Sequence, residues 1–180
     1  MEIEIILGKD LPDDTIERTN RQRIQEYGVN TKNFCKNEQE STFFYIKEAA
    51  VWKAFGMLKP VTITYQGEAF PILGIGNIIA VEKGRGHGKA LMMEIKAYLR
   101  EKDFVGLGFC EKDRSAFYLK CDYEVTANLS DRFRYQYASE MGDREQLNRP
   151  LDVLCFDVHQ TFMERLKSSD DLIYINVPFW

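Results

Sequence analysis

The stretch Ile-Ile-Ala-Val-Glu-Lys-Gly-Arg-Gly-His-Gly-Lys-Ala-Leu-Met, residues 78–92, is the most informative part of this sequence. Its apolar start is typical of a buried central strand, and Gly84, Gly86 and Gly88 then predict a turn. The pattern that follows predicts an amphipathic helix over residues 88–102. The backbone N–H groups at the start of a helix lack partners within it, and together with the helix dipole they favour a phosphate or pyrophosphate. The stretch therefore predicts an anion site between a strand and a helix.

Two common nucleotide-binding patterns do not match this turn. A Walker loop needs G-x-x-x-x-G-K-[ST], and Gly84 to Lys89 has neither that spacing nor the hydroxyl. The dinucleotide fingerprint G-x-G-x-x-G fails at its last gap, because only one residue separates Gly86 from Gly88. The turn is therefore not predicted to bind its anion in the manner of either of these two nucleotide-binding patterns.

The regions on either side of the turn predict alternating strands and helices. Pro60 and the pair Gln66-Gly67 separate the runs of the N-terminal half, and Gly74 and Gly76 suggest a bulge in the strand ahead of the turn. We expect strands over residues 2–7, 42–47, 50–58, 61–65, 70–81, 104–110, 133–137 and 151–158. Helices are expected from Pro12 to Gly28, over residues 114–120 and after residue 158; residues 30–41 are expected to be irregular and 172–180 to form an apolar end.

Composition is that of an ordinary globular protein, with 44% hydrophobic and 29% charged residues and a net charge of −4. The acidic balance argues against nucleic acid, which needs a basic surface, and no apolar run is long enough for a membrane span. The four cysteines form no C-x-x-C pair and the chain has two histidines, so no metal site is expected. We expect a cytoplasmic protein with reduced thiols.

Residues 85–90, Arg-Gly-His-Gly-Lys-Ala, match the pattern [Q/R]-x-x-G-x-[G/A]. Further on, residues 116–120 and Tyr123 are similar to the pattern A-x-x-[LF]-Y-x-x-x-G-[FY], with Asp122 where a glycine is usual. In this order, the two motifs resemble those of the GNAT superfamily of N-acetyltransferases. The resemblance is most specific over residues 75–125.

The resemblance implies an α/β fold of the α+β type. Its mixed, mostly antiparallel central sheet is flanked by helices and splayed between the fourth and fifth strands. Residues 1–180 would form a single acetyltransferase domain, with the core motif at 75–125 and C-terminal strands and a tail at 126–180. A homodimer is a possible assembly.

The resemblance also implies an enzyme that transfers an acetyl group from acetyl-CoA to a primary amine of a small molecule, by direct attack on the thioester. Tyr118 matches the tyrosine that protonates the leaving thiolate, and a phenol with a pKa of about 10 is neutral at pH 7. The main chain of the fourth strand would hold the pantetheine arm and the glycine turn the pyrophosphate. The expected cofactor-binding residues are Ile79, Ala80, Val81, Arg85, Gly86, His87, Gly88, Lys89 and Ala90.

The general base is not assigned. Asn77 stands where some family members carry a glutamate, and an amide cannot take a proton; Glu82 and Glu68 are placed by no motif. For His87, we expect the backbone N–H to matter while the ring points to solvent. An unprotonated fraction of the acceptor amine can suffice, since orientation alone lowers the barrier.

Among acetyltransferases, the layout resembles the aminoglycoside 2′-N-acetyltransferases. The chain ends in Trp180, whose carboxylate would then help to hold an amino sugar, and Asn77 is the other expected substrate residue. Pro178 stands where that family has an acid, and Asn77 where it has a glutamate, so two negative charges are missing. The missing glutamate would also suit a CoA-binding regulatory module without catalysis. If the motif is a coincidence, the chain is a small structural or interaction domain.

Overall fold

The computed structural model describes residues 1–28, 37–136, 144–146 and 150–177. They form two compact units: a first unit of residues 1–59 and 76–95, and a second unit of residues 60–75 and 96–180. Three elements continue from one unit into the other, namely β3 (Val51–Tyr65), β4 (Glu68–Ala80) and α3 (His87–Lys102). That residues 1–180 act as one domain stays a prediction.

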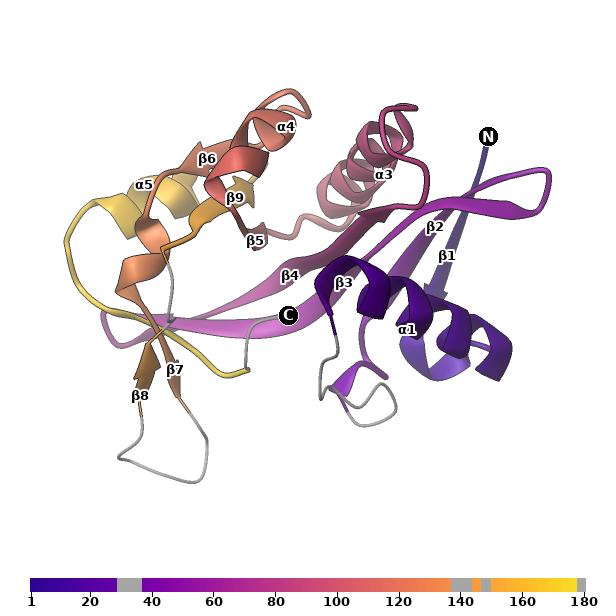
Figure 1. The fold of residues 1–180 in the computed structure, drawn as a ribbon. Helices are drawn as coiled ribbons and strands as arrows, with labels where there is room; N and C mark the ends of the chain where they lie inside the picture. The colour runs from indigo at the N-terminus through magenta and orange to yellow at the C-terminus, as the bar shows by residue number, and fades with distance from the viewer. Residues whose placement is uncertain (29–36, 137–143, 147–149, 178–180) are drawn as a thin grey trace. The chain divides into compact units, whose positions relative to one another are not determined.

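In the first unit, an antiparallel meander leads from the N-terminus to β3 (Figure 1). Its elements are β1 (Glu2–Leu7), a 3-10 turn (Gly8–Asp10), α1 (Asp13–Tyr27) and β2 (Thr42–Glu48). Gly28 ends α1 with a φ of 81°, a conformation that suits glycine, as the sequence predicts. The strand at residues 2–7 and the helix after Pro12 are thus confirmed.

The two strands expected at residues 50–58 and 61–65 are one continuous strand, β3. Pro60 lies inside it, although proline has no N–H to donate to a sheet. β2 pairs with β3 as far as Leu58, and β10 (Ile173–Ile175) pairs with it at Ile63 and Thr64. Pro60 falls between these two paired stretches, where the lack of an N–H is tolerated, and so it does not break the strand.

The start of α3 packs on the sheet within the first unit. At Gly56 of β3, an added Cβ would lie 2.6 Å from Ile78 Cδ1 and within 3.4 Å of side-chain atoms of Leu91 and Ile95. Leu91 and Ile95 are fully buried, in agreement with the apolar face that the sequence predicts for this helix. Gly56 therefore sets how closely α3 approaches the strands.

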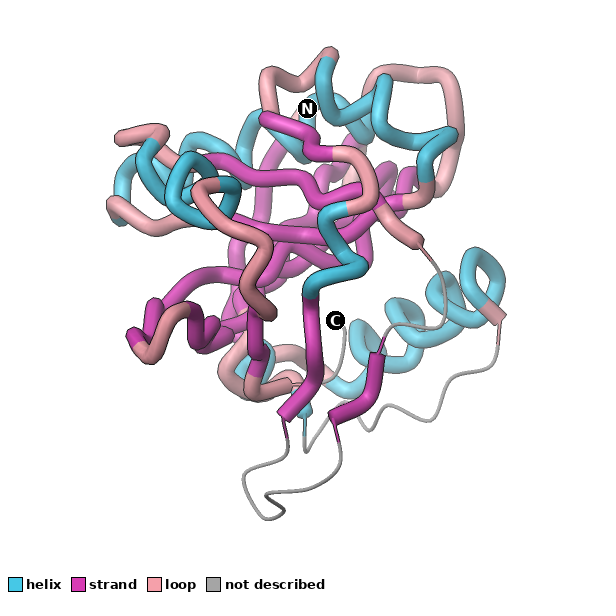
Figure 2. The backbone as a smooth tube through the Cα atoms, turned by 90° about the vertical axis from the view of Figure 1, so that its left-hand side faces the viewer, coloured by secondary structure: helices cyan, strands magenta, loops and turns pink. Residues whose placement is uncertain are grey.

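In the second unit, hydrogen bonds connect the strands in the order β6-β9-β5-β4-β3-β10-β7-β8. Most pairs are antiparallel; β4 with β5 and β7 with β10 are parallel, and β7 and β8 lie side by side (Figure 2). The strands are β5 (Gly106–Cys110), β6 (Glu124–Thr126), β7 (Phe133–Gln136), β8 (Arg144–Gln146) and β9 (Asp152–Phe156). The helices are α4 (Ser115–Leu119) and α5 (Thr161–Lys167), with 3-10 turns at Lys112–Arg114 and Leu129–Arg132.

The parallel pairing of β4 with β5 is short. In the register it covers residues 73–75 and 106–108, whereas β4 continues to Ala80. This agrees with the predicted splay between the fourth and fifth strands, and the predicted mixed, mostly antiparallel sheet with flanking helices is confirmed.

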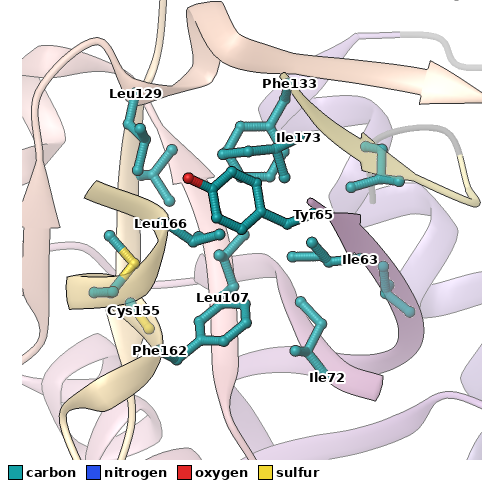
Figure 3. Packing of buried hydrophobic residues seen from close by; sticks show 14 of the residues in the cluster. Ile63, Tyr65, Ile72, Leu107, Leu129, Phe133, Cys155, Phe162, Leu166 and Ile173 are labelled. Atoms are coloured by element: carbon teal, nitrogen blue, oxygen red, sulfur yellow. The ribbon is translucent and has the colours of Figure 1, made fainter. Parts of the chain in front are cut away.

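The core of the second unit gathers around Tyr65, whose ring lies among Ile173, Phe133 and Leu166 (Figure 3). Phe162 and Leu166 of α5 close this core from the helical side, and both are buried. No helix in the described ranges is long and apolar enough to cross a membrane.

Candidate functional site

The glycine turn, residues 84–86, connects β4 to α3 in the first unit. Gly84 and Gly86 have φ values of 77° and 83°, which glycine adopts without strain. α3 begins at His87, and Ala90 N donates to Gly86 O at 3.0 Å. The N–H groups of the first helical residues therefore face forward from the helix, as an anion site requires. Arg85 and Lys89 are exposed beside them.

Two ion pairs hold the residues just ahead of the glycine turn. Lys53 Nζ lies 2.6 Å from Glu82 Oε1, and Lys83 Nζ lies 2.7 Å from Glu26 Oε1 of α1. The hydrogen bond from Lys53 lowers the pKa of Glu82 below its usual range. Glu82 is therefore a poor general base. In the second unit, Glu68 likewise pairs with a cation, Arg165, at 2.8 Å.

His87 is placed differently from the expectation. Its side chain does not point to solvent: the residue is only 7% exposed, and Nε2 lies 3.5 Å from Glu48 Oε1. Nδ1 is buried and makes no hydrogen bond within the part of the chain that the structure describes. The burial follows from its position as the first residue of α3, beside the end of β2. No local pattern signals this contact, because Glu48 lies 39 residues earlier in the chain.

The end of β4 offers main-chain groups, as expected for a pantetheine site. Ile79 is buried and Ala80 half-buried, while Val81 lies just past the strand and is 39% exposed. Val81 N already donates to Lys53 O at 2.9 Å, so that amide is paired within the protein. Tyr27 of α1 reaches the same strand, where its hydroxyl donates to Ile78 O at 3.4 Å.

Asn77 interrupts the regular geometry of β4. The sequence suggests an irregularity at Gly74 or Gly76, but the residue with a positive φ, 53°, is Asn77. Asparagine tolerates this left-handed conformation better than most residues, though at some cost. Its Nδ2 is buried and has no hydrogen-bond partner among the described residues. The irregularity in β4 therefore lies at Asn77, three residues before the strand ends at Ala80.

Tyr118 lies in α4 of the second unit. It is half-buried, its ring centroid is 5.0 Å from that of Phe117, and its carbonyl accepts hydrogen bonds from Cys121 N and Tyr123 N. Asp122 has a φ of 57°, the conformation for which the family pattern carries a glycine. Lys96 Nζ donates to the carbonyls of Asp122 and Cys121, at 3.0 and 3.4 Å.

The remaining predicted residues add less information about the site. Trp180 lies outside the described residues, as does Cys35. Cys110, Cys121 and Cys155 are buried free thiols, and burial raises the pKa of Cys110 and of Cys155, so these two are not reactive. Within the described ranges, no three His, Cys, Asp or Glu residues gather in a group that could hold a metal ion.

No family model matches this sequence, and no curated protein matches it. Solved structures do match. An acyl-CoA N-acyltransferase from Pseudomonas aeruginosa aligns with a TM-score of 0.57 at 12% identity, over 86% of this chain and 97% of that one. Escherichia coli ElaA aligns with a TM-score of 0.59 at 10% identity, over 87% of this chain and 99% of that one.

An N-acetyltransferase from Staphylococcus aureus Mu50 aligns with a TM-score of 0.57 at 14% identity, over 89% of this chain and 100% of that one. At such low identity, these likenesses show a shared fold alone. The chain thus has the fold of N-acyltransferases, in agreement with the fold that its motifs predict.

Proposed function

We propose that this protein is an acetyl-CoA-dependent N-acetyltransferase acting on a primary amine of a small molecule. The observation that carries the proposal is the glycine turn: Gly84 and Gly86, both at positive φ, lead directly into the N-terminus of α3. The same turn matches the pyrophosphate motif, and it stands in a fold shared with N-acyltransferases. A fold alone does not determine a reaction, so the proposal depends on the residues of the site.

The residues of the turn suit a diphosphate. A Cβ added at Gly84 or Gly86 would meet no atom of the described residues within 4 Å, which leaves room for a ligand on that side. Arg85 and Lys89 would add positive charge to the N–H groups of His87, Gly88 and Lys89. Main-chain groups of residues 79–81 would hold the pantetheine arm, with the Val81 carbonyl in place of its paired amide.

Acetyl-CoA would supply a thioester carbonyl as the acyl donor. The acceptor nitrogen forms the new N–C bond, the C–S bond breaks, the sulfur gains a proton and the nitrogen loses one. Tyr118 holds a proton on its phenol oxygen at neutral pH and can donate it to the leaving thiolate. Of these roles, only that of the acid belongs to a residue that the motif places; the proton lost by the nitrogen would pass to solvent water.

No carboxylate is assigned as general base. Glu82 and Glu68 are engaged in ion pairs, and Asn77 cannot accept a proton. We therefore propose that the acceptor binds as the unprotonated amine, which needs only to be oriented. The rate should then rise with pH until the amine of the acceptor is fully deprotonated.

The test is release of free thiol from acetyl-CoA in the presence of a panel of amines: polyamines, amino sugars including aminoglycosides, amino acids and short peptides. Amine-dependent release together with acetylated product supports the proposal, and the best amine identifies the acceptor class. Binding of acetyl-CoA without turnover by any amine would instead favour a regulatory module. A homodimer and a cytoplasmic location are further parts of the proposal, to be tested by molecular mass in solution and by cell fractionation.

A further inference from the structure

We infer that Asp152 is a positioning residue for Tyr118 and that it acts through Ser115. The inference rests on the proposed function, because it gives Tyr118 the role of acid. It concerns residues of the second unit only. Neither sequence motif includes Asp152, and neither predicts its hydrogen bond to Ser115.

Asp152 is a buried carboxylate with both oxygens in use. It is the first residue of β9, is 5% exposed and stands opposite Cys110, the last residue of β5. Ser115 Oγ donates to Asp152 Oδ2 at 2.5 Å, and Asn128 N donates to Asp152 Oδ1 at 3.1 Å. A carboxylate is buried at a cost unless it is hydrogen-bonded, so this pairing restricts what Ser115 can do.

Ser115 is the first residue of α4, the helix that carries Tyr118. α4 has only five residues, and a helix this short is not stable without outside contacts. No side chain caps its N-terminus. The turn after the helix is held by Lys96, through the carbonyls of Cys121 and Asp122. The hydrogen bond from Ser115 to Asp152 therefore anchors the opposite end.

The spacing connects this anchor to the phenol. Ser115 and Tyr118 are three residues apart, which places them on the same side of a helix, one turn from each other. A rotation or shift of α4 at Ser115 is carried to the Tyr118 side chain, and a displacement of about 1 Å at a reacting group can lower a rate by about a hundredfold. Asp152 would thus fix the position of the acid without touching the substrate.

Cys110 Sγ also lies near the anchor, 3.7 Å from Ser115 Oγ. Burial raises the pKa of this thiol, so it stays protonated and is a weaker hydrogen-bond acceptor than the carboxylate. Asp152 therefore remains the strong acceptor for the serine hydroxyl.

The test compares Ser115→Ala with Ser115→Thr, which keeps the hydroxyl. Each substitution is made both alone and together with Tyr118→Phe. Ser169→Ala is the matched control: Ser169 is also half-buried and donates to an aspartate, Asp171 Oδ2, at 2.7 Å, but it belongs to the segment between α5 and β10. The measurements are kcat with the best amine, the Kd of acetyl-CoA and the unfolding midpoint.

We expect Ser115→Ala to lower kcat about tenfold or more, with the Kd of acetyl-CoA within about twofold of the wild type. Ser115→Thr should restore most of kcat, and Ser169→Ala should leave it unchanged. With Tyr118→Phe, Ser115→Ala should have no further effect on kcat, because the acid that it positions is gone.

Equal losses of kcat from Ser115→Ala with and without the Tyr118 hydroxyl would overturn the inference, since Asp152 would then have only a structural role. An unchanged kcat in Ser115→Ala would overturn it as well. Failure of the proposed function gives a different result: the wild type itself would neither bind acetyl-CoA nor turn over.

Discussion

In the glycine turn of the first unit, the proposed function depends on the backbone, whereas in α4 of the second unit it depends on side chains. Gly84 and Gly86 hold positive φ angles, and the side chains of Arg85 and Lys89 extend into solvent. We therefore expect one region to be sensitive to conformation and the other to single functional groups.

Helix α4 shows the opposite construction. It spans five residues and depends on a serine hydroxyl, a buried carboxylate and a lysine from α3 to stay in place. None of its five residues has a positive φ, so nothing about its backbone is special to glycine. Removing a side chain here should therefore change chemistry, while removing a side chain beside the glycine turn should change binding only slightly.

The largest effect is expected at α4. Tyr118→Phe should lower kcat by about a hundredfold or more, as loss of a general acid does, with the Kd of acetyl-CoA unchanged. Tyr98→Phe is the control, because it removes the hydroxyl of another half-buried tyrosine, on α3. Steady-state kinetics and calorimetric binding make the comparison. Equal turnover in Tyr118→Phe would remove this residue from the mechanism.

The second effect concerns backbone conformation. Gly86→Ala and Gly67→Ala both place a side chain at a positive φ, 83° and 79°, in open space. Both should lose about 1 kcal/mol of unfolding free energy. Only Gly86→Ala should also weaken acetyl-CoA binding, by about tenfold, because only that turn is proposed to hold the pyrophosphate. Equal Kd values for the two variants would contradict the placement of the site.

A third, smaller effect separates charge from conformation. Arg85→Ala and Lys89→Ala remove exposed cations that would pair with the pyrophosphate, and one exposed ion pair contributes about 0.2–1 kcal/mol. The Kd of acetyl-CoA should rise about two- to fivefold in each, and the difference from the wild type should shrink as salt increases. A loss as large as that of Gly86→Ala would mean that side chains, rather than the backbone, make the site.

The smallest effect concerns one buried tyrosine in each unit at alkaline pH. Burial raises the pKa of Tyr45, in the first unit, to about 12, and burial also raises the pKa of Tyr123, just after α4. The unfolded chain ionises near the ordinary value of 10.0, so these groups stabilise the fold below pH 10 and lose that contribution as pH rises toward 12.

The unfolding midpoint should therefore fall between pH 10 and pH 12, and Tyr45→Phe should make that fall shallower. Tyr45→Phe also leaves the Thr19 hydroxyl without its 3.0 Å partner, and this loss should lower the midpoint at pH 7. Identical slopes in the variant and the wild type would show that Tyr45 ionises as freely as an exposed tyrosine.

Local patterns were sufficient for several elements and for the glycine turn, whereas the fold was predicted from the resemblance of the motifs. Apolar periodicity and glycine positions predict β1, α1, β4 and α3 within a few residues, and the family pattern has a glycine at position 122, where Asp122 takes a positive φ. These features are local because the chain alone specifies dihedral preference and amphipathic faces.

Features that depend on distant partners were not predictable. The continuity of β3 through Pro60 depends on where β2 and β10 end. The burial of His87 depends on Glu48, and the anchoring of α4 depends on Asp152, 37 residues after Ser115. A sequence read residue by residue specifies no such pairings, which arise only when the strands take their register.

Whether the glycine turn holds a pyrophosphate is decided by the unfolding midpoint of the full chain with millimolar acetyl-CoA, CoA or ATP. A ligand that binds the folded state adds about 2.7 kcal/mol of stability at a hundred times its Kd, which for a chain of this size is a rise of several degrees. We predict that rise with acetyl-CoA and with CoA but not with ATP. No shift with either form of CoA would contradict the proposal that the glycine turn holds a pyrophosphate.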